Sequence, residues 1–253
     1  PILFLVLFVI LPLLVVLSYA FTNGDGKVSF HNFVAFFGSA KTMGTLLYSV
    51  VIAVITTVLC LLIAYPTAYI LAKTKMKSGD ALLMLFVLPM WINFTLRITA
   101  LKEILTLLEG NLALHPFLNT IVGMVYDFLP FMIYPIYNTL QKMDRSLIEA
   151  AYDLGANRRE VFIKVILPLS TPGIYSGIIM VFMPTVSTFA IAELLTRNKI
   201  TLFGSLIQRA FGEGGIMMWN YGAALSLIML VIIGLTSFFG NHDENDSQTA
   251  GIV

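Results

Sequence analysis

The sequence predicts an all-α integral membrane protein with six transmembrane helices and a polar two-helix loop between the fourth and the fifth. Composition is the first observation, because the 253 residues are 58% hydrophobic and 11% charged, with a mean hydropathy of +0.89. A soluble domain carries roughly 25% charged residues, so this chain lacks the charge to cover a surface that faces water. The other two observations are the recurrence of long apolar runs and the basic, polar segment that separates two of them at residues 141–171.

A helix needs about 20 mainly apolar residues to cross the roughly 30 Å hydrocarbon core of a bilayer. Six runs meet this requirement and form one domain of residues 1–253: residues 2–21, 45–72, 81–101, 119–140, 172–192 and 219–239. The first run contains Pro12 and lacks a small-residue cleavage site, which favours a span over a signal peptide. Because the chain begins at Pro1, we expect a cytoplasmic N-terminal segment to precede it. The third run is interrupted by Asn93 and Arg97.

Proline residues lie inside most of these runs. They are Pro12, Pro66, Pro89, Pro130, Pro135 and Pro184. Neighbouring helices in a bundle satisfy the carbonyl groups that a proline leaves free, so a span tolerates an internal proline. We therefore expect these prolines to kink their helices rather than to end them.

The distribution of Lys and Arg predicts which loops face the cytoplasm, because cytoplasmic loops carry an excess of these residues. The loops at 73–80 and 141–171 contain eight of the fifteen: Lys73, Lys75, Lys77, Lys142, Arg145, Arg158, Arg159 and Lys164. Both loops are therefore placed in the cytoplasm, and six spans then put both termini there. The loops at 22–44, 102–118 and 193–218 lie outside. The tail at 241–253 is acidic and does not follow this pattern.

The loop at 141–171 predicts two short helices joined by a turn. Ser146 followed by Glu149 has the spacing of a capping box at a helix start. Gly155 follows the last apolar residue of this first helix, where a residue in the left-handed conformation commonly ends a helix. The first helix is therefore expected to run from about residue 146 to residue 154.

The second helix of the loop has its own start signal and its own stop. Asn157 with Glu160 repeats the capping-box spacing, and Pro168 is expected to break the helix and lead into the fifth span. Its apolar residues are spaced for one face. From this pattern alone, the helix pair could insert into a groove of a partner protein or lie as an amphipathic hairpin on anionic lipid.

A motif in this loop carries a family resemblance. The segment contains Glu149-Ala150-Ala151, then Gly155, then Val165 and Leu167-Pro168. This arrangement resembles the EAA motif in the cytoplasmic loop of permease subunits of binding-protein-dependent ABC importers. The resemblance implies that the loop docks on an ATPase subunit. The coupling residues that it implies are Glu149, Ala150, Ala151, Asp153, Gly155, Arg158, Phe162 and Pro168.

The same resemblance implies the partners of such a permease: a homologous second permease subunit, two ATP-binding subunits and an extracytoplasmic solute-binding protein. The sequence has no G-x-x-x-x-G-K-[ST] motif, so ATP and Mg²⁺ are expected in the partner ATPase, with no cofactor in this chain. We therefore expect a protein that is not an enzyme on its own. A single cysteine, Cys60, and three histidines give no basis for a metal site. The net charge of +1 gives no indication of nucleic-acid binding.

Charged residues inside spans are costly and are therefore candidates for function or for pairing. The candidates are Arg97, Asp127 and Glu193. Two interpretations stay open for Asp127: an ion pair with Arg97 that locks two helices, or, together with Glu193, a transient ligand for a cation that enters from outside. Polar and aromatic residues nearby complete the candidate substrate pathway, and the rings could add cation–π contacts or simply pack: Trp91, Asn93, Tyr126, Tyr134 and Phe189.

Longer stretches resemble the B-type permease subunits of spermidine/putrescine importers. They are Leu88–Arg97 (LPMWINFTLR), Val125–Met132 (VYDFLPFM), Leu147–Ala151 (LIEAA) and Asp153–Ala156 (DLGA). The resemblance extends over residues 45–235 and implies a polyamine substrate and a place in a bacterial cytoplasmic membrane. The sequence departs from the family at Ala190, where relatives carry an aromatic residue, and at Asp127, where some carry an apolar one.

Two alternatives to a polyamine permease stay open. An ABC permease for iron or an oxyanion belongs to the same class, because the loop carries no information about the substrate. An ion-coupled secondary transporter belongs to a different class and would use Asp127 as a proton or sodium site. Such a transporter has no reason to keep the 141–171 loop.

Overall fold

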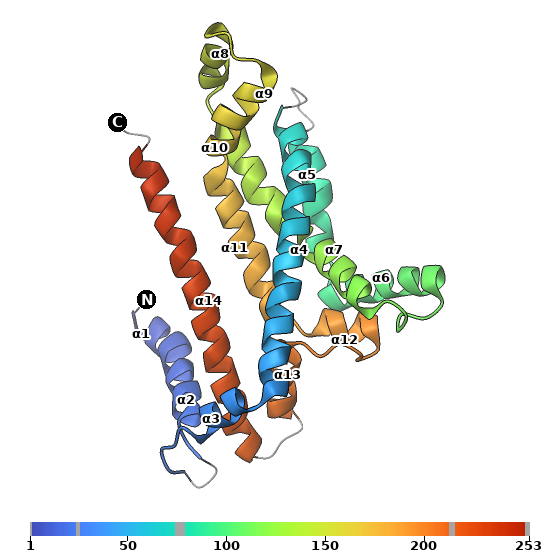
Figure 1. The fold of residues 1–253 in the computed structure, drawn as a ribbon, viewed down its shortest axis with the longest axis vertical. Coiled ribbons are helices and arrows are strands. Elements are labelled where there is room, and N and C mark those ends of the chain that lie inside the picture. The colour runs from blue at the N-terminus through green and yellow to red at the C-terminus, as the bar shows by residue number, and fades with distance from the viewer. Residues whose placement is uncertain (1, 24–25, 74–78, 213–215, 251–253) are drawn as a thin grey trace.

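The computed structural model describes residues 2–23, 26–73, 79–212 and 216–250, and within these ranges the chain is almost entirely helical (Figure 1). An isolated antiparallel bridge joins Thr22 and Val28. Lys75 and Lys77 of the loop at 73–80 lie outside the described residues, as do the side chains of the acidic tail. The described part of the chain therefore has the all-α fold that the composition predicts.

The elements follow one another along the chain as helices with short connections. They are α1 (Ile2–Leu5), η1 (Val6–Ile10), α2 (Leu11–Ala20), α3 (His31–Gly38), α4 (Ala40–Lys73), α5 (Gly79–Val87), η2 (Leu88–Trp91), α6 (Phe94–Glu109), α7 (Pro116–Lys142), α8 (Arg145–Asp153), α9 (Arg158–Val161), η3 (Phe162–Ile166), α10 (Leu167–Leu169), α11 (Thr171–Ser187), α12 (Ala190–Thr196), α13 (Phe203–Gly212) and α14 (Ile216–Ala250). Within the described ranges, four helical stretches are long and apolar enough to cross a membrane, or up to six if each of two bent pairs is one span.

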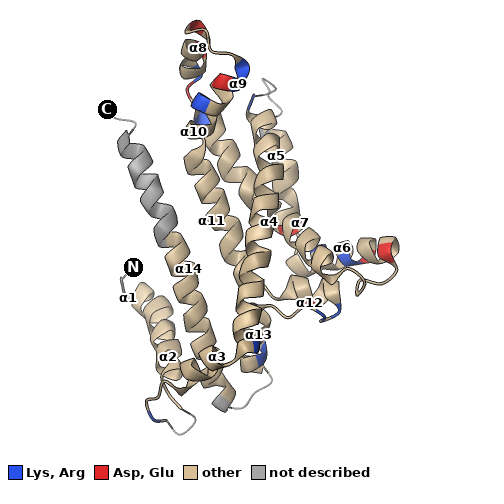
Figure 2. Ribbon diagram, in the orientation of Figure 1, with Lys and Arg blue, Asp and Glu red and all other residues tan. Residues whose placement is uncertain are grey.

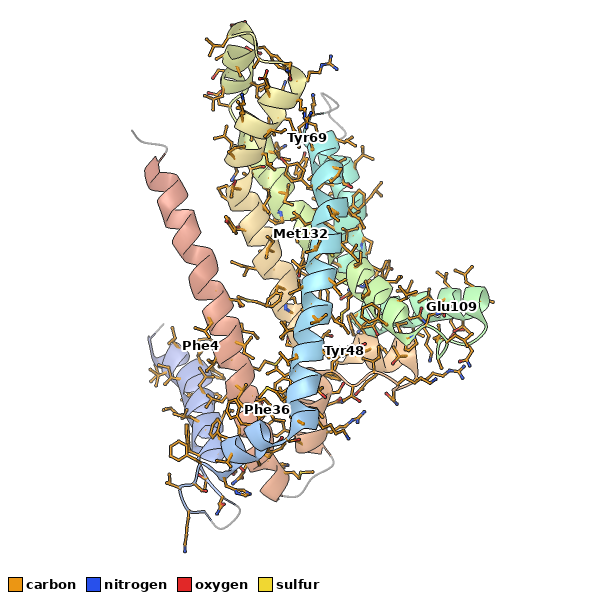
Figure 3. The ribbon with its side chains drawn as sticks, viewed as in Figure 1. Phe4, Phe36, Tyr48, Tyr69, Glu109 and Met132 are labelled. Carbon is orange, nitrogen blue, oxygen red and sulfur yellow. The ribbon has the colours of Figure 1, made fainter. Side chains whose placement is uncertain are left out.

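Helices α4, α7 and α11 pack against one another and form the centre of the molecule. Their shared core includes the buried side chains of Ile52, Met124, Met132, Ile133 and Val181, and Figure 3 labels Met132 at this centre. Helix α14 packs against α2, α11 and α13. Figure 1 shows α8 and α9 beyond one end of the long helices, with α3 and α13 at the opposite end.

Two glycines allow α11 to approach α7 closely. Gly173 and Gly177 are four residues apart on α11, and both are buried. A Cβ at Gly177 would come within 2.6 Å of Met132 Sδ, and one at Gly173 within 2.8 Å of the Pro135 carbonyl oxygen, both on α7. This is the Gly-x-x-x-Gly spacing by which small residues let helix backbones meet in a membrane. The motif is visible in the sequence and was not among the predicted features.

Most of the internal prolines lie within helices, as predicted. Pro66 is inside α4, Pro130 and Pro135 are inside α7, and Pro184 is inside α11. These spans therefore continue through their prolines.

The two π-helical turns, η1 and η3, each precede a proline. The Leu11 N–H donates to the Val6 carbonyl and the Leu167 N–H to the Phe162 carbonyl, five residues back in each case. A proline ring clashes with the carbonyl four residues earlier, and a wider turn relieves that clash. Pro168 lies in the last turn of its helix, which ends one residue later at Leu169 and is followed by a bend of 58° into α11, in line with the predicted break.

Pro89 ends its helix, contrary to the prediction of a kink. Helix α5 stops at Val87, the chain tightens into the 3₁₀ turn η2, and α6 begins at Phe94 after a bend of 98°. Asn93 caps α6, because its side chain accepts a hydrogen bond from the Thr95 N–H at 2.9 Å. The predicted third span, 81–101, is therefore two segments at nearly a right angle. The predicted fifth span, 172–192, is likewise interrupted, because α11 ends at Ser187 and α12 begins at Ala190.

Candidate functional site

The polar loop contains the two helices that the sequence predicts, but the first has a different cap. Helix α8 begins at Arg145, and the Asp144 side chain accepts a hydrogen bond from the Ser146 N–H at 2.9 Å. The predicted capping box of Ser146 and Glu149 is therefore wrong, since Asp144 occupies the capping position before Arg145. This bond from the backbone lowers the pKa of the Asp144 carboxyl group.

Gly155 ends α8 in the manner expected from the sequence. Its φ is +84°, in the left-handed region. The Gly155 N–H donates to the Tyr152 carbonyl at 2.9 Å, and the Ala156 N–H donates to the Ala151 carbonyl at 3.1 Å. These two bonds form a Schellman motif, which satisfies carbonyls at the helix C-terminus. A Cβ at Gly155 would meet no heavy atom of the described residues within 4 Å, so a side chain there would strain φ without a clash inside this part of the subunit.

The second helix of the loop starts with the predicted capping box. Asn157 Oδ1 accepts hydrogen bonds from the N–H groups of Arg159 and Glu160, both at 3.0 Å. Glu160 Oε2 accepts a hydrogen bond from the Asn157 N–H at 3.0 Å, and Lys164 lies 3.5 Å from the same carboxylate. The bond from Asn157, followed by the charge of Lys164, lowers the pKa of Glu160. The start of α9 is therefore fixed by local interactions that the sequence alone reveals.

The two loop helices differ in how much of their apolar surface is covered. Val161 and Ile166 of the second helix are buried, and Phe162 and Val165 are half-buried. On α8, by contrast, Leu147 and Tyr152 are exposed, and Leu154 directly after it is 90% exposed. Figure 2 shows charged residues gathered around α8 and α9. Helix α8 is therefore the part of the loop that presents an uncovered apolar and charged surface.

Most of the predicted coupling residues lie on the exposed surface of the loop. Ala151 is half-buried, and Pro168 is exposed within α10. The other exposed ones, on or next to α8 and α9, are Glu149, Ala150, Asp153, Gly155 and Arg158. These residues are therefore open to a partner.

Phe162 behaves differently, because its ring packs inside the subunit. The ring lies 5.9 Å from the Tyr65 ring and 5.5 Å from the Tyr69 ring, edge-on to both. Both tyrosines belong to α4 and were not among the predicted site residues, although their spacing of four residues places them on one helix face. Phe162 is therefore an internal contact between the loop and a central helix.

Among the described residues, the two buried charges in the membrane-spanning part form an ion pair. Arg97 Nη2 donates to Asp127 Oδ1, and the side chains are 8% and 4% exposed. Arg97 Nη1 also donates to the Pro89 carbonyl at 3.3 Å, which ties the bend before α6 to α7. Of the two interpretations left open for Asp127, the structure contains the pairing with Arg97.

The third predicted charge also lies near an arginine. Glu193 on α12 is 3.8 Å from Arg209 on α13, and both side chains are partly exposed. At this distance the two groups attract each other without a hydrogen bond. Arg209 was not a predicted pathway residue, and no sequence signal links it to Glu193, because the contact joins two separate helices.

The predicted aromatic residues of the pathway lie mostly on the surface. Trp91 at the end of η2 is 81% exposed, and Tyr126 and Tyr134 are exposed on α7. Phe189 is half-buried at the start of α12. These rings therefore contribute little to the core of this subunit and remain available to a neighbour, to lipid or to a substrate.

Comparison with known proteins gives consistent results in sequence and in structure. A sequence profile for the "Binding-protein-dependent transport system inner membrane component" matches residues 64–242. The chain is 37% identical to the "Spermidine/putrescine transport system permease protein PotB" of Haemophilus influenzae, covering 92% of this chain and 88% of the relative. It is 35% identical to the PotB of Escherichia coli K12, covering 91% of this chain and 90% of the relative.

Two solved structures share the fold. A bacterial ABC transporter involved in the import of the acidic polysaccharide alginate superposes with a TM-score of 0.70, at 18% sequence identity, over 97% of this chain and 92% of that one. The MetNI methionine ABC transporter in an inward-facing conformation gives a TM-score of 0.63, at 17% identity, over 83% of this chain and 99% of that one.

Proposed function

Because this chain belongs to the family of binding-protein-dependent transport system inner membrane components, we propose that it forms half of the translocation pathway of an ATP-driven polyamine importer. The proposed partners are a homologous second permease subunit, two ATPase subunits and an extracytoplasmic binding protein. ATP and Mg²⁺ bind in the ATPase subunits. Membership of this family also leaves the ion-coupled secondary transporter without support.

One observation carries the coupling part of this proposal. Helix α8 is exposed beyond the ends of the long helices, while the helix that follows it packs on the subunit. An exposed helix with Leu147 on it, Leu154 directly after it and small residues at Ala150 and Ala151 suits a shallow groove on a partner. We assign that groove to the ATPase subunit, with the predicted coupling residues apart from Phe162 on the contact surface.

The substrate part of the proposal rests on the two PotB relatives and on the chemistry of the exposed residues. A polyamine is a flexible chain of ammonium groups separated by alkyl spacers. Aromatic faces attract such cations, and Trp91, Tyr126 and Tyr134 are exposed on this subunit. We therefore place these rings on the wall of a pathway shared with the second permease.

The two acidic candidates have different parts in this pathway. Asp127 is buried and neutralised by Arg97, so it serves the structure of the subunit. Glu193 is partly exposed and 3.8 Å from Arg209, which leaves its carboxylate open to a substrate ammonium group. We therefore assign the substrate contact to Glu193 and not to Asp127.

In the bacterial cytoplasmic membrane, α8 and α9 face the cytoplasm, in line with their excess of Lys and Arg. Both chain termini are placed on the same side. The segments around α3 and α13 then face the binding protein from the outer surface.

The experiment that tests this function is uptake of radiolabelled spermidine and putrescine into proteoliposomes that contain the complete complex and internal ATP. The control omits this subunit while keeping its partners. We expect uptake that needs this chain, ATP and the binding protein. A complex that assembles and hydrolyses ATP in response to a loaded binding protein for iron or an oxyanion, with no polyamine uptake, would contradict the substrate assignment and keep the importer.

A further inference from the structure

The loop contacts α4 through three aromatic rings, Phe162 of the loop and Tyr65 and Tyr69 of α4, which we call the aromatic joint. This joint lies inside the subunit, away from the surface assigned to a partner. The ring of Phe162 meets Tyr69 and Tyr65 edge-on, at interplanar angles of 83° and 85°. Edge-to-face pairs of this kind are each worth about 0.5–1.5 kcal/mol beyond the area that they bury. Figure 3 labels Tyr69 at the end of α4 that lies beside the loop.

A hydrogen bond between Tyr65, one turn before Tyr69 on α4, and Ser170 strengthens the aromatic joint. The Tyr65 hydroxyl and Ser170 Oγ are 3.0 Å apart, and Ser170 is fully buried. Ser170 Oγ also lies 2.9 Å from the Leu167 carbonyl, which accepts a hydrogen bond from it. The phenol of Tyr65 therefore contacts the loop helix through its ring and through its oxygen.

Ser170 is also the residue at which the loop helix bends into α11. The bend is 58°, and Ser170 forms a backbone hydrogen bond on each side of it: its N–H donates to the Ile166 carbonyl at 2.9 Å, and its carbonyl accepts from the Ile174 N–H at 3.1 Å. The loop helix is thus joined to α11 at Ser170 and to α4 through side chains.

At the Tyr69 side of the aromatic joint, the charged side chain of Lys73 contacts the tyrosine. Lys73 Nζ donates to the Tyr69 hydroxyl at 3.1 Å and lies 5.3 Å from the centre of the same ring. Lys73 is the last residue of α4, so the end of this helix is connected to the aromatic joint through Tyr69. Helices α4 and α11 both pack on α7, so a displacement of the joint reaches all three central helices.

We propose that Phe162, held between Tyr65 and Tyr69, and Ser170, held by Tyr65, are positioning residues that make the docking loop move as one body with α4 and α11. This inference rests on the proposed function of the loop. Helix α8 receives the force from the ATPase subunit, and the joint passes it to α4 directly instead of through α11 alone. Without the joint, the loop helix would pivot at Ser170 and leave α4 behind.

The test compares variants in the complete complex, reconstituted with partners, binding protein and ATP. Phe162→Ala removes the ring, Phe162→Tyr keeps it, and Ile163→Ala truncates the neighbouring exposed side chain as a matched control. Tyr65→Phe keeps the ring and removes the hydroxyl that forms a hydrogen bond with Ser170. For each variant we would measure retention of the ATPase subunits on purification, ATP hydrolysis, and polyamine taken up per ATP hydrolysed.

We expect Phe162→Ala to keep the ATPase subunits bound and to consume at least fivefold more ATP per polyamine imported. Tyr65→Phe should show a smaller increase, and Phe162→Tyr and Ile163→Ala should stay within twofold of the unsubstituted complex. The proposal would be overturned if Phe162→Ala left the ATP consumed per polyamine unchanged. It would also be overturned if Phe162→Tyr showed the same increase in ATP consumed as Phe162→Ala. Failure of the proposed function can be told apart from failure of the aromatic joint. If the proposed function is wrong, the unsubstituted complex itself shows no polyamine uptake and no ATP hydrolysis that depends on the loaded binding protein. Both proposals would then be wrong.

Discussion

At the scale of single residues, Gly155 has a conformation that few other residues adopt. Its φ of +84° lies in a region where a left-handed conformation costs an L-residue roughly 1–2 kcal/mol. Asparagine visits this region more readily than a β-branched residue does. The space around Gly155 is open within the described part of the subunit, so conformation can be tested separately from steric contact with a partner.

We predict that Gly155→Val lowers transport roughly fivefold or more, because about 1–2 kcal/mol of strain unwinds the end of α8. Gly155→Asn should be affected less. Both variants should reach the membrane in normal amounts, as judged by immunoblotting beside uptake. Equal losses in the two variants would point to contact with the partner as the cause, in place of backbone strain.

A second prediction at this scale concerns the ion pair of Arg97 and Asp127. Removing one member leaves an uncompensated buried charge, which typically costs about 3–5 kcal/mol. Arg97→Met and Asp127→Leu should therefore each lower the Tm of the purified subunit sharply, while the double variant recovers most of the loss. Additive losses in the double variant would show that the two side chains act independently.

At the scale of elements, the structure depends on how closely α7 and α11 approach. Gly177 of α11 has Met132 and Pro135 of α7 directly against it. A Cβ at Gly234 of α14 would meet no heavy atom of the described residues within 4 Å, so this glycine offers a control in another apolar helix.

We predict that Gly177→Val destabilises the subunit by about 1–3 kcal/mol, the usual cost of overpacking a core. Gly234→Val should change the stability by less than about 0.5 kcal/mol, the range expected for surface substitutions. Thermal unfolding followed in detergent measures both. A similar loss in the two variants would mean that helix propensity dominates over the α7–α11 contact.

At the scale of the whole molecule, two pairs of opposite charges among the described residues join separate helices. Arg97 with Asp127 joins α6 to α7, and Arg209 with Glu193 joins α13 to α12. The first pair is buried and the second is partly exposed. A cationic substrate can therefore compete with Arg209 for its carboxylate far more easily than with Arg97.

We predict that Glu193→Gln raises the KM for polyamine uptake about threefold to tenfold, which corresponds to about 0.7–1.4 kcal/mol of lost attraction. Assembly with the ATPase subunits should stay intact. Glu103→Gln, at an exposed acidic residue of α6, is the matched control. An unchanged KM in Glu193→Gln would remove Glu193 from the pathway.

The sequence by itself determined the features that depend on local patterns. Composition determined the membrane class, apolar runs located α4 and α7, and capping chemistry located Gly155 and the Asn157–Glu160 box. These features depend on interactions between residues that are neighbours along the chain, so the interactions do not require the tertiary fold.

Only the tertiary structure decided which distant side chains meet. Arg97 pairs with Asp127, Phe162 packs against Tyr65 and Tyr69, and Pro89 ends a helix where Pro66 does not. Each outcome depends on the rotation and depth of one helix relative to another. Helix periodicity fixes which residues share a face, but it leaves open which neighbouring helix that face will meet.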